Sequence, residues 1–151
     1  MAEWIATICS GVWAAVAIVL SLTERPGNGS ALSESSFTLY RRLSIKGVPV
    51  LIGLIFLGSA AAIYTWIEGR NDVFLYGALI LLVMFPLSAI FVMPYNRLAM
   101  EHNTDALGEA MDRMFRRWWL IHVIRTVLAL IAFVLFVGGL SFWAEGLPGN
   151  A

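Results

Sequence analysis

The chain has 151 residues, of which 60% are hydrophobic and only 13% are charged, and its formal net charge is zero. Soluble globular domains are about half apolar and about a quarter charged, so this composition excludes an ordinary soluble domain. The balanced charge also provides no general attraction to nucleic acid or to acidic partners, and we expect no nucleic-acid binding.

The hydrophobic residues fall into four long blocks, each near or above the ~20 residues that a helix needs to cross ~30 Å of hydrocarbon. The blocks are Trp4–Leu22, Val48–Ile67, Val73–Met93 and Trp119–Trp143. Only helices and closed barrels satisfy their backbone in lipid, and these blocks lack the alternation of barrel strands. The sequence therefore predicts an all-α integral membrane protein, in which residues 1–151 form a single four-helix transmembrane bundle.

The first predicted helix covers about residues 4–22 and contains Cys9, the one cysteine of the chain. A lone cysteine excludes an intrachain disulfide, and inside an apolar block it behaves as a small hydrophobic residue. The N-terminal stretch lacks the basic region of a signal peptide, so we expect a retained helix.

The second and third helices are predicted at about residues 48–67 and 73–95. Pro49 falls in the first turn of the second helix, where proline is tolerated, and an interfacial helix is expected before it, from about Ser36. Pro86 lies in the middle of the third helix, and we expect it to kink that helix.

The last helix, at about residues 105–143, is predicted to begin before the membrane as an amphipathic extension. Trp118, His122 and Arg125 lie at positions i, i+4 and i+7, which places them on one helical face. The same phase continues through Ala129, Ala132, Phe136 and Gly139. The small residues of this stripe allow a neighbouring helix to approach closely or leave space for a ligand, so Ala129 is a candidate ligand contact.

The orientation follows from the lysines and arginines of the loops. Loops 23–47 and 96–117 together carry eight of these residues, and the short middle loop carries one, Arg70. By the positive-inside rule both long loops are cytoplasmic and both termini are non-cytoplasmic.

Arg125 is the most informative residue, because a charge inside a spanning helix is expensive and usually serves a function. The plain alternative is that its long side chain bends back to the lipid headgroups. We favour an interior position, where Arg125 would hold an anion or a polar ligand, since its phase matches that of His122.

His122 has two interpretations that the sequence does not separate. It could hydrogen-bond a neighbouring helix, or it could act, as a neutral imidazole, as a general base. Asn96 ends the third helix at the same membrane level, where its amide could bind an oxygen atom or simply cap the chain. A metal site is not expected, because His102 is the only other histidine and lacks a ligand spacing.

These residues carry a resemblance to a known family. Pro94-x-Asn96, a short polar loop and then Trp118-x-x-x-His122-x-x-Arg125 resemble the anthrone-oxygenase-like membrane proteins, and Lys46-Gly47-x-Pro49 agrees more loosely. For the characterised members, the resemblance implies oxidation of an anthrone to an anthraquinone by dioxygen, without an obvious cofactor.

Within that resemblance, His122 would take the acidic methylene proton, and Arg125 and Asn96 would stabilise the resulting anion. Trp118 shares the polar face and could stack on the aromatic substrate or simply pack inside the bundle, and Ala129 is the other candidate substrate contact. The expected partners are membrane lipid and a small aromatic molecule. The alternative is a non-catalytic accessory or scaffold subunit of a larger membrane complex, in which the polar residues hold the bundle together and other membrane subunits are the partners.

Overall fold

The computed structural model describes residues 1–23, 34–69, 71–92 and 109–145. Within these ranges the chain forms four long helices and one short π-helical segment: α1 (Ala2–Thr23), α2 (Glu34–Gly69), α3 (Asp72–Leu87), η1 (Ser88–Val92) and α5 (Glu109–Glu145). Each long helix contains a segment that is long and apolar enough to cross a membrane. The prediction of an all-α membrane bundle is therefore confirmed.

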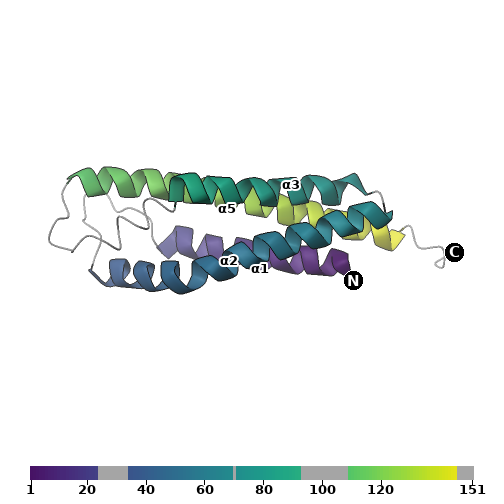
Figure 1. The fold of residues 1–151 in the computed structure, drawn as a ribbon, viewed down its shortest axis with the longest axis horizontal. Helices are drawn as coiled ribbons and strands as arrows, with labels where there is room; N and C mark the ends of the chain where they lie inside the picture. The colour runs from purple at the N-terminus through teal and green to yellow at the C-terminus, as the bar shows by residue number, and fades with distance from the viewer. Residues whose placement is uncertain (24–33, 70, 93–108, 146–151) are drawn as a thin grey trace.

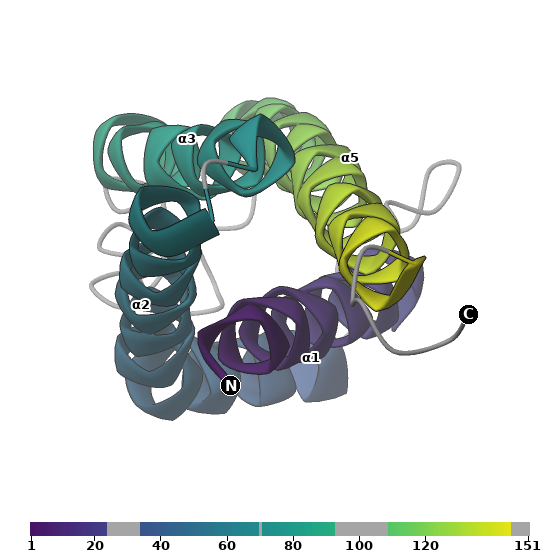
Figure 2. The same cartoon turned by 90° about the vertical axis from the view of Figure 1, so that its right-hand side faces the viewer.

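The four helices form a ring in which each packs against two neighbours. Along the chain α1 packs on α2, α2 on α3 and α3 on α5, and the ring closes where α5 packs on α1. Figure 1 shows the helices running along one common direction, and Figure 2 shows the ring viewed from its end. The first and last helices of the chain are thus neighbours, which brings α1 against the polar face of α5.

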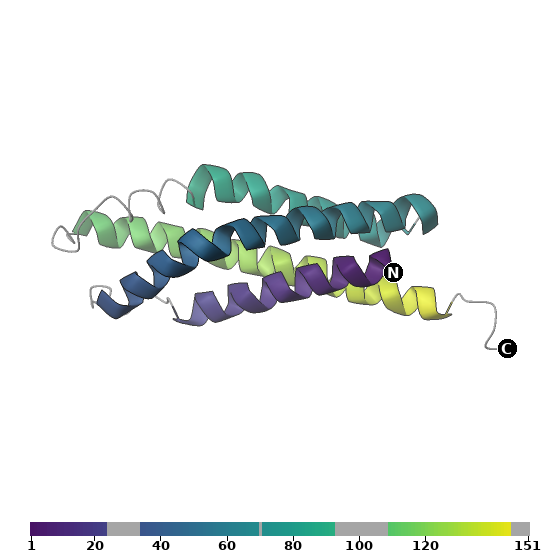
Figure 3. The same ribbon diagram turned by 60° about the horizontal axis from the view of Figure 1, so that its bottom comes forward.

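Helix α2 is longer than predicted, because the expected interfacial helix is continuous with the spanning helix. Pro49 consequently lies inside α2 and not in its first turn. A proline within a helix removes one backbone hydrogen bond and its ring presses on the preceding turn, which bends the helix. Figure 3 shows α2 changing direction between its blue N-terminal part and its teal C-terminal part.

The expected disturbance at Pro86 takes the form of a change in helix type. Pro86 lies in the last turn of α3, and the chain continues as the π-helix η1. The missing N–H of the proline interrupts the regular hydrogen-bond ladder, and wide π turns are one way in which a helix accommodates such an interruption. The last residues of the predicted helix at 73–95, and the start of the predicted helix at 105–143, lie outside the described residues.

The core is built from the inward faces of all four helices. Its largest fully buried side chains include Trp13 on α1, Ile55 on α2, Phe74 on α3 and Phe136 on α5. Many large hydrophobic side chains face outward instead, as expected of helices surrounded by lipid.

Candidate functional site

The polar face of α5 points into the bundle. Trp118, His122, Arg125 and Ala129 are all buried, and so are Ala132, Phe136 and Gly139, which continue the same stripe. Arg125 is only 7% exposed, so its side chain does not reach back to the surface of the bundle. The interior position that the helical phase predicts for these residues is confirmed.

His122 is held by contacts on two sides. Its Nε2 lies 3.3 Å from the carbonyl oxygen of Ala17 on α1, and its ring stacks on Trp118, with centroids 5.2 Å apart and ring planes 6° apart. A backbone carbonyl can only accept a hydrogen bond, so Nε2 carries the proton. In the neutral imidazole this leaves the lone pair on Nδ1, which is the nitrogen able to accept a proton.

Hydroxyl groups join α1 to α5 beside the histidine. Ser21 Oγ donates to the Ala17 carbonyl oxygen at 2.8 Å, Thr126 Oγ1 donates to the His122 carbonyl oxygen at 2.9 Å, and the two hydroxyl oxygens are 3.1 Å apart. The two hydroxyl groups have only two protons for these three contacts. At any moment, therefore, one of the three contacts is not a hydrogen bond. Of these contacts only the one between the two hydroxyls crosses from α1 to α5, and the indole N–H of Trp119 adds another, to the Ser21 carbonyl oxygen at 3.3 Å.

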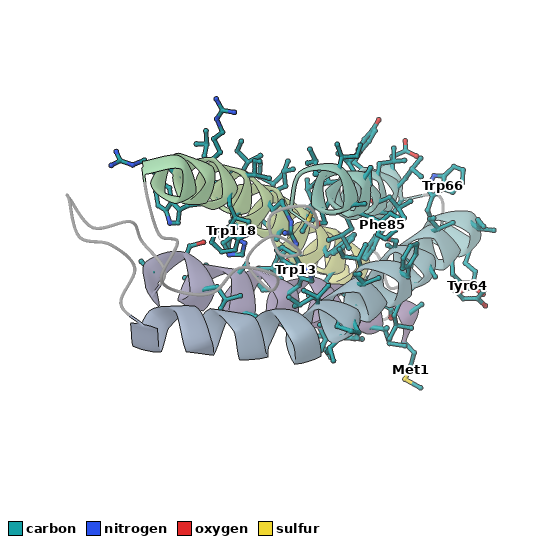
Figure 4. The ribbon with its side chains drawn as sticks, turned by 60° about the vertical axis from the view of Figure 1, so that its left-hand side comes forward. Met1, Trp13, Tyr64, Trp66, Phe85 and Trp118 are labelled. Carbon is teal, nitrogen blue, oxygen red and sulfur yellow. The ribbon has the colours of Figure 1, made fainter. Side chains whose placement is uncertain are left out.

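Arg125 lies on the other side of His122, deeper in the bundle. Its guanidinium carbon is 5.0 Å from the centre of the Trp13 ring on α1, a cation–π contact. Its buried Nε has no hydrogen-bond partner among the described residues, and no described carboxylate forms an ion pair with it. Figure 4 shows Trp13 and Trp118 inside the bundle, between α1 and α5.

Two further buried polar atoms have no hydrogen-bond partner in the described part of the chain. They are the indole Nε1 of Trp13 and the hydroxyl of Ser59 on α2. A buried polar group without a partner costs about 1–3 kcal/mol, so such groups call for an explanation.

The cluster contains residues that sequence reasoning did not select. Trp13, Ala17 and Ser21 all lie on α1, four residues apart, and each contacts the polar face of α5. Their spacing of four residues puts them on one helical face, but the apolar middle of α1 gives no sequence signal that marks this face as the inner one. Asn96 lies outside the described residues, so the cluster described here joins His122, Arg125, Trp118 and α1.

The described residues contain no group of three histidine, cysteine, aspartate or glutamate side chains arranged to hold a metal ion. The chemistry that the cluster itself can offer is proton transfer at His122 Nδ1 and stabilisation of negative charge by Arg125. Both groups lie in an apolar environment, where electrostatic interactions are stronger than in water.

The sequence of the chain matches a known protein family. The model of the anthrone oxygenase family matches residues 37–135, which is more than half of the chain and includes the cluster residues of α5. No curated protein and no solved structure matches the chain. The four-helix membrane bundle described here therefore belongs to the anthrone oxygenase family.

Proposed function

We propose that this protein oxidises an anthrone-type aromatic substrate with dioxygen inside the membrane, and that the cluster of His122 and Arg125 is its active site. The observation that carries the proposal is the buried guanidinium of Arg125, which has no carboxylate partner among the described residues. A buried cation without an anion is costly, and a substrate that becomes anionic during the reaction supplies the missing charge.

His122 acts as the general base in this proposal. The methylene hydrogen between the two aromatic rings of an anthrone is acidic, because its loss gives an aromatic phenolate-like anion. The Nδ1 of His122 takes this proton, while the hydrogen bond from Nε2 to Ala17 holds the ring in place. The flat stack on Trp118 also restricts rotation of the imidazole.

Arg125 stabilises the negative oxygen of the anion that forms. The anion then passes one electron to dioxygen, and the resulting pair combines to a peroxide at the former methylene carbon. Protonation of the peroxide, loss of the second hydrogen and cleavage of the oxygen–oxygen bond leave a ketone and release water. One oxygen atom of dioxygen thus enters the product and the other leaves as water.

The remaining substrate contacts are also part of the proposal. Ala129 follows Arg125 by one helical turn on the same buried face, and we propose that it contacts the substrate beside the guanidinium. Trp118 offers an aromatic surface on the other side of His122. Asn96, outside the described residues, is proposed as a second donor to the substrate oxygen.

A second candidate function is supported by the hydrogen bonds of the cluster. His122, Ser21 and Thr126 all link α5 to α1, as expected if the cluster only holds the helices together in an accessory or scaffold subunit. This interpretation leaves the buried charge of Arg125 without a purpose, and we therefore place it second.

Anthrone-dependent oxygen uptake by the purified protein in detergent tests the proposal. After subtraction of the uncatalysed rate, we expect His122→Ala to lower the rate about 10²–10⁴-fold, because a general base contributes about that much. Arg125→Ala should lower it about 10²–10³-fold, as the loss of a single oxyanion donor does.

Two further variants distinguish an effect on the reaction from an effect on the folding of the protein. Ser141→Ala changes an exposed hydroxyl on the same helix and should retain full activity. Arg125→Lys preserves the charge, and partial activity is expected from it. An inactive wild type, with His122→Ala and Arg125→Ala both losing stability, would instead assign the cluster to the accessory or scaffold role.

A further inference from the structure

Trp13 is the most deeply buried tryptophan of the cluster, yet its indole N–H is not used. The side chain is 1% exposed, and its Nε1 has no hydrogen-bond partner among the described residues. Buried tryptophans normally place this N–H on an acceptor, because the indole can donate but cannot accept. The position therefore lacks an acceptor.

Arg125, which lies beside Trp13, also has a buried donor without an acceptor. Arg125 packs on the Trp13 ring, with its guanidinium carbon 5.0 Å from the ring centre, and its buried Nε is also without a partner in the described part of the chain. Arginine, like the indole, can only donate. The two groups cannot satisfy each other, so whatever satisfies them must bring an acceptor atom.

A water molecule could accept from both donors, but it would not balance the charge of the guanidinium. An oxygen atom with negative charge accepts from both donors and also balances the guanidinium, whereas a carbonyl oxygen accepts from both donors without balancing the charge. Because the surroundings are apolar side chains and aromatic rings, the rest of such a molecule is expected to be apolar as well.

We propose that Trp13 is a substrate-binding residue, whose indole N–H donates, together with Arg125, to one carbonyl or phenolate oxygen of an aromatic ligand. This inference rests on the function proposed above and adds a residue from α1 to its site. Residues 1–36 precede the segment that the family model matches, so the family relationship makes no statement about Trp13.

Binding of two flat three-ring molecules under nitrogen tests this assignment without any oxidation. Anthraquinone carries carbonyl oxygens, whereas anthracene has the same ring system without an oxygen. The test variant is Trp13→Phe, which keeps an aromatic ring under Arg125 but removes the N–H. The control is Trp4→Phe, the same replacement on the same helix at a side chain that is 58% exposed.

We expect Trp13→Phe to weaken the binding of anthraquinone about tenfold, the effect of losing one hydrogen bond, and to leave the binding of anthracene unchanged. Trp4→Phe should change neither. Equal weakening for both ligands would mean that Trp13 only shapes the site, and unchanged anthraquinone binding would show that the N–H does not contact the ligand. Either result overturns the assignment.

A second measurement serves if the phenylalanine variant does not fold. In the indole N–H region of the NMR spectrum of the wild type, anthraquinone should shift one tryptophan resonance downfield, and anthracene should not. Replacement of the other five tryptophans, one at a time, assigns that resonance to Trp13 by elimination. Absence of a downfield shift overturns the assignment.

The outcome is separable from that of the oxygen-uptake assay. Active protein in which Trp13→Phe binds anthraquinone normally would retain the oxygenase function and reject Trp13 as a ligand contact. Inactive protein that binds anthraquinone through Trp13 would retain the binding site and reject the oxygenase function.

Discussion

At the scale of single residues, Arg125 shows how a charge is kept inside a membrane bundle without an ion pair. The guanidinium rests on the face of Trp13, and a cation–π contact in a desolvated place contributes about 2 kcal/mol. This contact holds the charge but does not neutralise it. Hydroxyl groups on Ser21 and Thr126 already join α1 to α5, so helix association alone does not require an arginine here.

Ser59 provides a prediction about stability at the same scale. Its hydroxyl is buried on α2, 2% exposed, and has no hydrogen-bond partner among the described residues. Replacing an unpaired buried hydroxyl by hydrogen removes a desolvation cost, so Ser59→Ala should leave the melting temperature in detergent unchanged or raise it by a few degrees, equivalent to about 1 kcal/mol.

Ser10→Ala is the matched comparison, because Ser10 is equally buried but donates to the Thr7 carbonyl oxygen. That variant should be slightly destabilised. A larger loss of stability in Ser59→Ala than in Ser10→Ala would show that the Ser59 hydroxyl has a partner after all.

At the scale of helices, α3 and α5 are joined by two reciprocal glycine–phenylalanine contacts. Phe136 of α5 lies against Gly77 of α3, and Phe74 of α3 lies against Gly139 of α5. The two rings stack on each other, with centroids 5.5 Å apart and planes 20° apart. Each glycine thus makes room for the ring of the opposite helix, and the close approach fixes the register of α3 on α5.

These reciprocal contacts, called the interlock below, predict that alanine substitutions at the adjacent Gly138 and Gly139 have different effects on stability. A Cβ atom on Gly139 would lie 2.7 Å from Phe74 Cε2, whereas one on Gly138 would meet no atom within 4 Å. Gly139→Ala should therefore destabilise the bundle by about 1–3 kcal/mol, the usual cost of overpacking a core. Gly138→Ala should be neutral or slightly stabilising, since alanine is the better helix former.

Thermal denaturation of both variants in the same detergent checks this prediction. Equal melting temperatures for the two would mean that the Phe74 ring moves aside without cost and that the interlock does not hold α3 on α5.

The same helices show what sequence reasoning can and cannot provide. The four spans follow from hydropathy, and the helical phase through His122 correctly places Ala129, Ala132 and Phe136 in the interior. The phase works because the polar residues mark one face of α5. The middle part of α1 is apolar on all sides, so no polar residue marks its inner face. From the sequence alone, Trp13 therefore cannot be distinguished from other tryptophans of membrane helices. Its contact with Arg125 is known only from the structure.

The structure also differs from the prediction at Pro49, where the tendency of proline to end a helix competes with the helix-forming sequence around it. Pro49 follows a segment with good helical sequence, and continuation of the helix through the proline prevails over a separate interfacial helix. Asn96 lies outside the described residues, so its expected role at the substrate stays a prediction.

At the scale of the whole molecule, the chain crosses the bundle four times, and the described ends of α1 and α5 that are nearest the termini lie at the same end (Figure 1). Most lysines and arginines counted in the basic loops 23–47 and 96–117 lie on helices at the opposite end: Arg41, Arg42 and Lys46 on α2, and Arg113, Arg116 and Arg117 on α5. We propose that the end with the basic loops is cytoplasmic, because such residues are retained on that side.

Single-cysteine labelling tests the orientation. In a Cys9→Ala background, Ala151→Cys should react with a membrane-impermeant maleimide in intact cells, whereas Ser30→Cys should react only after the membrane is permeabilised. The reverse pattern would invert the protein in the membrane and place the His122 end of the bundle on the outer side.

The closure of the ring between the first and last helices has a consequence for biosynthesis. The residues of α1 that contact His122 and Arg125 are synthesised before α2 and α3, and their counterparts on α5 follow those helices. Until α5 has left the ribosome and inserted, the indole of Trp13 and the hydroxyl of Ser21 face lipid or whatever protein is near. A chain that is released before α5 is made therefore contains three of the four helices and lacks the cluster of His122 and Arg125.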